Sequence, residues 1–117
     1  MARNISFALT TQQIRDRTKT VTRRLGWKNI KPGDMLNACV KCMGLKKGEK
    51  PERLAVIRVV SVSREELCLC TTADAAREGF PDFKGWEFVA MFCEHMQCDA
   101  TAMVTRIEFE YVDREGQ

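Results

Sequence analysis

The sequence is best interpreted outward from Arg17-Thr18-Lys19-Thr20-Val21-Thr22-Arg23-Arg24, which contains four basic residues, three hydroxyls and no carboxylate. Threonines at every second position disfavour a helix, because β-branched side chains lose rotamer freedom and hydroxyls compete for backbone hydrogen bonds. The pattern therefore predicts an extended segment whose side chains alternate between two faces. One face would carry Thr18, Thr20, Thr22 and Arg24, and the other Lys19, Val21 and Arg23. A twist or bulge would let Lys19 and Thr22 converge.

Two interpretations of this basic segment remain open. Hydroxyls beside cations suit an anionic or carbonyl-bearing ligand. A basic run is also typical of a solvated edge strand, where charged side chains prevent pairing with another chain.

The spacing of Lys19, Thr22 and Arg24 resembles the motif Gly-x-Lys-x-x-Thr-x-Arg of ASCH domains. These are small pseudo-barrels related to the PUA domains of RNA-modifying proteins. Arg17 stands where the motif has glycine, and a residue with a Cβ resists positive φ. The order of predicted elements extends the resemblance over nearly all of the chain. It implies an α+β fold, a small mixed β-pseudo-barrel with two or three helices packed at its openings, as a single domain over residues 1–117.

Length and composition agree with one globular domain that has a modest core. The chain has 117 residues, of which 44% are hydrophobic and 30% charged. No run approaches the ~18 consecutive apolar residues of a membrane span, and the first residues do not resemble a secretory signal. We therefore expect a cytoplasmic monomer with no membrane partner.

Charge is distributed unevenly along the chain. Residues 1–66 carry 15 Lys and Arg against 6 Asp and Glu, and residues 67–117 carry 4 against 10, so balances of +9 and −6 sum to the net +3. This asymmetry indicates either a positive face that could meet phosphates or two halves that interleave and neutralise each other.

Hydrophobic periodicity predicts the remaining elements. We expect strands over residues 4–9, 35–41, 54–65 and 104–112, and helices over residues 10–17, 71–79 and 84–96. Thr71 and Asp74 resemble a capping box at the start of the second helix. In the third helix Trp86, Val89, Ala90 and Cys93 recur at helical spacing with Phe88 and Phe92 beside them, and we expect these aromatic side chains in the core.

Six cysteines suggest a metal site only weakly. Cys39 and Cys42 have the spacing of zinc ligands, and Cys93, His95 and Cys98 cluster the only histidine between two thiols. Free cysteine is also commonly a small buried hydrophobe, as is natural for Cys68 and Cys70. We therefore assign no metal ligand and no cofactor.

Residues 43–53 form a predicted polar loop with three lysines, Lys46, Lys47 and Lys50. The loop is either a solvated connection or a flap whose lysines, Lys46 and Lys47 first, contact a nucleic-acid backbone.

The resemblance also implies a function, because this chain is similar to the N4-acetylcytidine amidohydrolases among ASCH domains. Thr22 would act as the nucleophile or position water, and a neutral Lys19 would act as its base. Arg17, Arg23 and Arg24 would depress the pKa of that lysine and bind the ligand, with Arg24 at the developing oxyanion. Glu78, the counterpart of the family's carboxylate at a helix end, would carry a proton to the departing amine.

Two other functions remain open. One is a non-catalytic module in which the same cations bind RNA or another single-stranded nucleic acid. The other is a ribonuclease, which would need a general base near the scissile phosphate. His95 is the only histidine, but it is isolated in the sequence, so we do not nominate it as that base. The partner is in either case RNA or a modified nucleoside.

Overall fold

The computed structural model describes residues 3–41 and 47–112. It contains five strands, three α-helices and two 3₁₀ turns. In chain order these are β1 (Arg3–Ser6), η1 (Ala8–Thr10), α1 (Thr11–Arg15), β2 (Val21–Arg24), β3 (Met35–Cys39), β4 (Arg53–Glu66), η2 (Leu67–Leu69), α2 (Thr72–Arg77), α3 (Gly85–Met96) and β5 (Met103–Tyr111).

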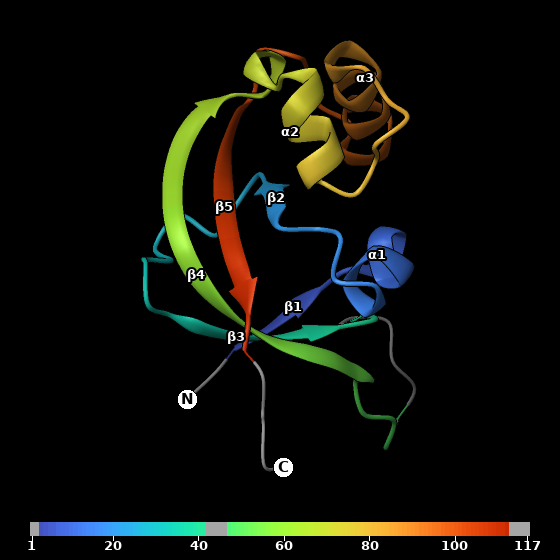
Figure 1. The fold of residues 1–117 in the computed structure, drawn as a ribbon, viewed down its shortest axis with the longest axis vertical. Coiled ribbons are helices and arrows are strands. Elements are labelled where there is room, and N and C mark those ends of the chain that lie inside the picture. The colour runs from blue at the N-terminus through green and yellow to red at the C-terminus, as the bar shows by residue number, and fades with distance from the viewer. Residues whose placement is uncertain (1–2, 42–46, 113–117) are drawn as a thin grey trace.

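The strands form one mixed sheet in the order β1-β3-β4-β5-β2. Strands β1 and β3 are parallel, and the other neighbouring pairs are antiparallel. Strands β4 and β5 arc along the length of the molecule, with α2 and α3 at one end and α1 about midway, beside β1 (Figure 1). This curled half-barrel with helices at its openings is the predicted α+β architecture.

Alternation of side chains explains the two long strands. In β5 Thr105, Ile107 and Phe109 are buried, whereas Glu110 is exposed. The register pairs Val59 of β4 with Phe109 and then shifts by one residue, which is a β-bulge that bends the strand. The bend lets this one pair of strands contribute to both ends of the molecule.

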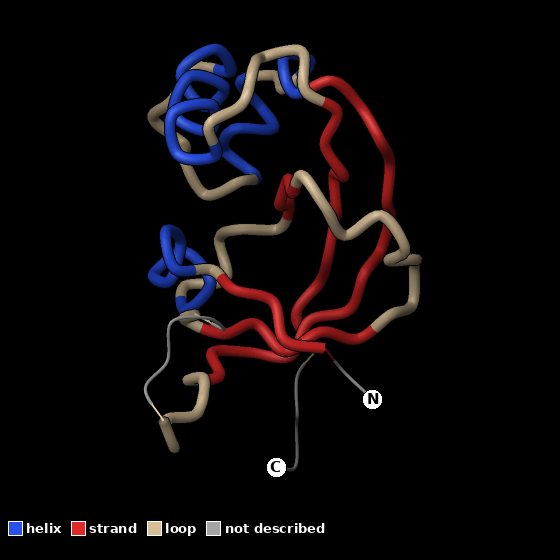
Figure 2. The backbone as a smooth tube through the Cα atoms, turned by 180° about the vertical axis from the view of Figure 1, so that it is seen from behind, coloured by secondary structure: helices blue, strands red, loops and turns tan. Residues whose placement is uncertain are grey.

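The buried hydrophobic residues form two clusters. Figure 2 shows the backbone that carries them, with a group of helices at one end of the molecule and strands converging toward the other. The first, which we call the strand cluster, includes Ile5, Phe7, Ile14, Leu36, Ile57, Val59, Ile107 and Phe109. The second, the helix cluster, comprises Leu67, Cys70, Ala75, Phe88, Val89, Phe92 and Val104. The basic segment runs between them.

Only part of the basic segment is a strand. The chain is strand from Val21 to Arg24, and it turns sharply before that because Arg17 adopts a left-handed conformation with φ of 62°. The turn that the motif's glycine would provide is therefore present, although arginine occupies the position. Thr22 and Arg24 do share a face, as the alternation predicted, since Arg24 donates a hydrogen bond to the Thr22 hydroxyl.

Four sequence predictions differ from the structure. Cys68 is exposed, whereas Cys70 is buried as the sequence suggested. The first strand ends at Ser6 and a 3₁₀ turn follows, so Leu9 is 61% exposed rather than buried. Trp86 is 70% exposed, because α3 buries the face that carries Phe88, Val89 and Phe92. The Thr71 hydroxyl accepts a hydrogen bond from the Asp74 backbone, but the Asp74 carboxylate contacts arginines instead of completing the capping box.

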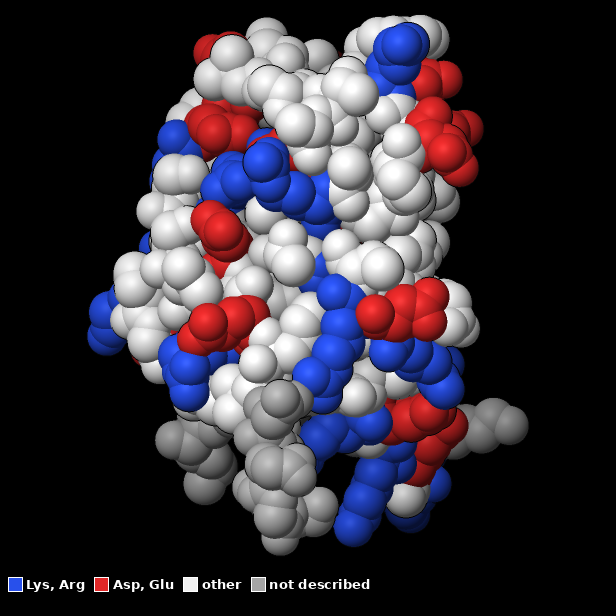
Figure 3. Space-filling model, in the orientation of Figure 1, with Lys and Arg blue, Asp and Glu red and all other residues white. Residues whose placement is uncertain are grey.

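The described residues contain no helix that is both long and apolar enough to cross a membrane. Basic and acidic side chains lie next to each other over the face drawn in Figure 3. Ion pairs such as Arg58–Glu110 and Arg23–Asp74 join the two halves of the sequence.

Candidate functional site

A pocket of about 230 Å³ lies between the two hydrophobic clusters. Its walls come from η1 and the residues before it, from the basic segment, from the end of α2 and from one face of α3. The described lining residues are Ser6, Phe7, Ala8, Leu9, Thr10, Lys19, Thr22, Arg23, Arg24, Glu78, Phe80, Phe88, Met91, Phe92, His95 and Met96. The pocket therefore brings together Lys19, Thr22, Arg23, Arg24 and Glu78, which are five of the eight residues selected from the sequence.

Lys19 is held at the bottom of this pocket. Its backbone amide donates to the Gln13 carbonyl, and its own carbonyl accepts from the Tyr111 hydroxyl at 2.6 Å. Its Nζ donates to the Glu78 carbonyl at 2.7 Å and to Glu78 Oε1 at 2.8 Å. Burial lowers the pKa of Lys19 below its ordinary value of 10.5, Glu78 offsets part of that effect, and the charges of Arg24 and Arg23 add to it. An ammonium has three protons, so one remains for a ligand.

Glu78 is placed by the end of α2. The next residue, Gly79, has φ of +104°, and this left-handed turn redirects the chain toward Phe80. Gln13 Nε2 donates to the Gly79 carbonyl at 3.1 Å and ties the turn to α1. The two Glu78 oxygens are divided between two cations, Oε1 to Lys19 and Oε2 to Arg23 at 3.0 Å.

Arg23 links Glu78 to a second group of charges. Its guanidinium also donates to Glu65 Oε2 at 2.9 Å and to Asp74 Oδ2. Burial alone would lower the pKa of Arg23, but the Asp74 hydrogen bond and the Glu78 charge raise it above its usual range. Asp74 in turn accepts two hydrogen bonds from Arg106, at 2.8 and 2.9 Å, and one from Arg77 at 2.9 Å. Sequence reasoning assigned Asp74 only to a helix cap.

Thr22 and Arg24 form the other polar side of the pocket. Arg24 Nε donates to Thr22 Oγ1 at 3.1 Å, and Arg24 NH2 donates to the Ser6 carbonyl at 2.6 Å. The Arg24 guanidinium also lies 4.9 Å from the centre of the Phe7 ring, within the range of a cation–π interaction. Since Arg24 donates to Thr22 Oγ1, the hydroxyl proton of Thr22 points elsewhere and can be given to another group.

Two of the three cations that line the pocket, Lys19 and Arg23, are already paired with carboxylates. Lys19 and Arg23 are buried and both contact Glu78, and Arg23 has two further carboxylates. A phosphate would have to compete with these carboxylates for the cations. The arrangement is thus better suited to a neutral, polar ligand than to a polyanion.

Aromatic and sulfur-containing walls complete the pocket, and sequence reasoning assigned these side chains to the core or did not select them. Phe80 packs against Phe88 with ring centres 5.8 Å apart, and Phe88 lies 6.1 Å from Phe92. His95 and Met96 follow one turn later on α3 and are exposed at the mouth. The spacing Phe88, Phe92, His95 on one helix face could have revealed this wall.

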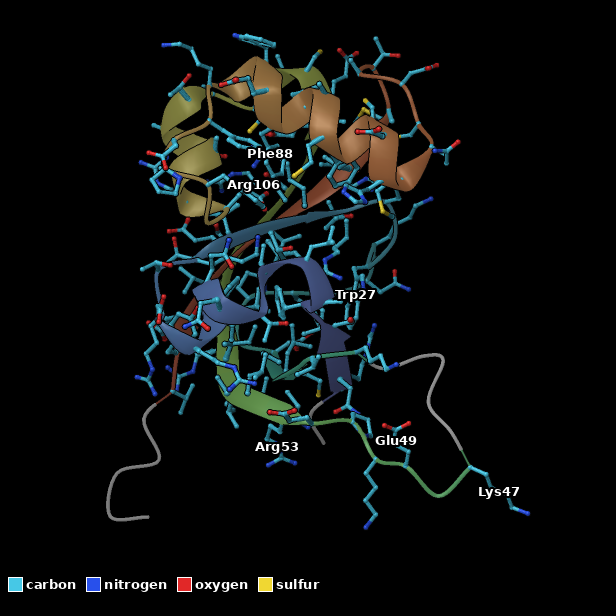
Figure 4. The ribbon with its side chains drawn as sticks, turned by 90° about the vertical axis from the view of Figure 1, so that its right-hand side faces the viewer. Trp27, Lys47, Glu49, Arg53, Phe88 and Arg106 are labelled. Atoms are coloured by element: carbon cyan, nitrogen blue, oxygen red, sulfur yellow. The ribbon has the colours of Figure 1, made fainter. Side chains whose placement is uncertain are left out.

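Three of the selected residues are not in the pocket lining or not described. Arg17 is exposed, with its guanidinium 5.3 Å from the centre of the Tyr111 ring. Lys47 extends from the loop before β4, far from Phe88 in the pocket wall (Figure 4). Lys46 lies outside the described residues.

The two parts of the possible zinc site are separated. Cys39 is buried in β3, at the opposite end of the molecule from α3, which carries Cys93 and His95 (Figure 1). Cys42 is outside the described residues. Over residues 3–41 and 47–112, no group of three His, Cys, Asp or Glu side chains is arranged to hold a metal ion.

No protein-family model matches this chain, and no curated protein matches it in sequence. Solved structures do resemble it. An ASCH domain from Lactobacillus crispatus JV V101 has a TM-score of 0.62 at 16% identity, over 93% of this chain and 78% of that one. A protein of the DUF984 family from Enterococcus faecalis V583 has a TM-score of 0.62 at 19% identity, over 96% and 80%. The hypothetical protein PH0355 has a TM-score of 0.63 at 15% identity, over 96% and 100%. The chain therefore has the fold of an ASCH domain, as the motif predicted.

Proposed function

We propose that this ASCH-fold chain binds one acylated nucleoside in the pocket and hydrolyses the amide on its base, with N4-acetylcytidine as the reference substrate. The observation that carries the proposal is the buried Lys19–Glu78 pair, which lines the same pocket as Thr22. A phosphate-binding patch would need only exposed cations, whereas a base, a hydroxyl and a proton carrier in one pocket are what amide hydrolysis requires.

The size and walls of the pocket support a single small ligand. Pockets for drug-sized molecules usually enclose about 300–1,000 Å³, and this one encloses about 230 Å³. Phe80, Phe88 and Phe92 offer faces on which a planar base can stack. The pocket therefore suits one base with its substituent rather than a segment of polymer.

The mouth of the pocket favours a free nucleoside over a nucleotide within RNA. Among the described lining residues, those exposed to solvent are Ala8, Leu9, His95 and Met96. None of them is Lys or Arg, and phosphates on either side of a bound nucleotide would need such partners.

The proposed reaction uses groups that line the pocket. Neutral Lys19, favoured by the lowered pKa, takes the Thr22 proton as Oγ1 attacks the amide carbonyl carbon. Glu78 relays that proton to the departing amine, and the C–N bond breaks. Water then cleaves the threonine ester, so that amide and water become amine and carboxylic acid. Arg24 orients Thr22 and would stabilise the developing oxyanion.

The test is incubation of the full chain with N4-acetylcytidine, other acylated nucleosides, unmodified nucleosides and short RNAs, followed by mass spectrometry. We expect release of cytidine and acetate from N4-acetylcytidine. Thr22→Ala, Lys19→Met and Glu78→Gln should each reduce the rate by at least about 100-fold, the usual contribution of such groups. Lys47→Ala, far from the pocket, is the matched control and should leave the rate unchanged.

Full activity in the Thr22→Ala protein would contradict this mechanism.

A second candidate function is binding without catalysis. The aromatic walls of the pocket favour it, because an unstacked RNA base can stack on them. That function predicts RNA affinity that falls steeply with salt and no product from any substrate. Cleaved RNA in the same panel would instead indicate a ribonuclease.

A further inference from the structure

The end of helix α3 brings two cysteines together beside the pocket. Gln97 has a left-handed conformation with φ of 55°, and the Cys98 amide donates to the Cys93 carbonyl at 3.3 Å. This is a Schellman-type helix end, in which the side chains of the two hydrogen-bonded residues normally touch. Here both of these side chains are thiols.

We propose that Cys93 and Cys98 form a reversible disulfide that closes the C-terminal end of α3. Both thiols are free and half-buried in the structure, and both side chains pack against the helix cluster. Disulfides require Cα atoms within about 4.4–6.8 Å, and the backbone hydrogen bond between these two residues holds their Cα atoms close. The inference is independent of the proposed function.

The chemistry needs a two-electron oxidant, and we take it to be a peroxide. One thiolate attacks the peroxide, the O–O bond breaks, and a sulfenic acid and one water molecule result for hydrogen peroxide. The second thiol attacks that sulfur, the S–S bond forms, and a second water leaves. Burial raises the pKa of Cys93, and Cys98 and Asp99 raise it further.

The position of this pair gives the cross-link a structural effect. His95 and Met96, which line the mouth of the pocket, lie between the two cysteines in the sequence. Without a disulfide, hydrogen bonds hold the left-handed helix end at Gln97. The backbone amides of Gln97 and Cys98 donate to the Cys93 carbonyl, and the Gln97 side chain donates to the Glu94 carbonyl at 2.8 Å. A disulfide would prevent this end from fraying and would fix the two mouth residues.

The sequence makes the test direct. Trypsin cleaves after Lys84 and Arg106 and at no site between them, so residues 85–106 form one peptide with Cys93 and Cys98 as its only cysteines. The full chain is treated with hydrogen peroxide, alkylated and digested without reduction. We expect this peptide to lose two hydrogens and to resist alkylation at both thiols, and dithiothreitol should restore both. Oxidation of methionines in the peptide adds oxygen without changing the alkylation count.

Two variants and a second measurement complete the experiment. Cys98→Ser should abolish the cross-link, whereas Cys68→Ser, which removes an exposed thiol elsewhere, should leave it intact. Amide hydrogen exchange over residues 94–98 should slow in the oxidised wild type and not in oxidised Cys98→Ser. A peptide that keeps two alkylatable thiols while Cys68 is oxidised would overturn the proposal, and so would a cross-link from residues 85–106 to another peptide.

Discussion

Lys19 and Glu78, 59 residues apart in the sequence, form a buried ion pair with Nζ 2.8 Å from Oε1 and with each side chain only 3% exposed. Nζ also donates to the Glu78 carbonyl at 2.7 Å. This pair joins the basic segment to the end of α2, and so connects the strand cluster to the helix cluster across the pocket.

Replacing Glu78 by glutamine should destabilise the protein strongly. The substitution preserves the shape of the side chain but removes the buried negative charge that pairs with both Lys19 and Arg23. Breaking a buried pair by removing one partner usually costs about 3–5 kcal/mol. Urea unfolding followed by circular dichroism measures the change in the free energy of unfolding.

The control for that variant is Glu110→Gln. Glu110 pairs with Arg58 on the surface, where both side chains are about half exposed. Removing an exposed pair should cost less than about 1 kcal/mol. Equal losses in the two variants would contradict the importance of the buried pair.

The pH dependence of stability should report the state of Lys19. Because its pKa in the folded protein is below 10.5, the unfolded chain binds more protons between the folded pKa and 10.5. Stability contributed by this residue must therefore rise with pH through that window and level off above it. The measurement is the difference in unfolding free energy between wild type and Lys19→Met across a pH series, because titrating groups that do not contact Lys19 cancel. A difference that stays flat up to pH 10.5 would show that the lysine is not desolvated.

Acid stability should depend on Arg106 more than on Arg77. Hydrogen bonds from Arg106, followed by those from Arg23 and Arg77, hold the pKa of Asp74 well below its ordinary value of 3.8, against the opposing effect of burial. The resulting stability is complete above pH 3.8 and is lost as the pH falls through the folded pKa. Arg106→Gln should raise that pKa and move the acid unfolding midpoint to higher pH. Arg77→Gln, whose side chain is half exposed, should move it less, and the reverse order would refute the assignment.

Alanine at position 79 should be poorly tolerated. Gly79 has φ of +104°, and an added Cβ would lie 2.8 Å from Gln13 Cγ. Backbone strain of this kind costs about 1–3 kcal/mol, and displacement of Gln13 would also weaken its hydrogen bond to the Gly79 carbonyl. Gly26→Ala is the control, since nothing lies within 4 Å of its added Cβ. Thermal unfolding should show a lower Tm for the first variant and little change for the second.

Local patterns predicted much of the fold. The alternation of residues in β5 and the run of β-branched residues in β4 correctly predict strands, because each strand has a buried face. The Thr71 hydroxyl forms the predicted N-terminal hydrogen bond of α2. The motif residues Lys19, Thr22 and Arg24 and the distant Glu78 line one pocket, while their chemical roles stay predictions.

The differences arise where tertiary contacts override local signals. Leu9 fits an alternating strand, but Phe7 already turns the chain, with its amide bonded to the Cys39 carbonyl. Trp86 fits a helical apolar stripe, yet the neighbouring Gly85 lies against the Cys70 carbonyl and sets which face of α3 is buried. Asp74 satisfies a local capping pattern, and only the fold brings Arg23 and Arg106 to its carboxylate.

The separation of the core into a strand cluster and a helix cluster has a mechanical consequence. Bending of the paired strands β4 and β5, which contribute to both clusters, would change the width of the pocket between Phe7 on one side and Phe88 on the other. A ligand bound between these two rings would contact both sides of the pocket. Binding of the ligand would therefore also make the whole domain more rigid.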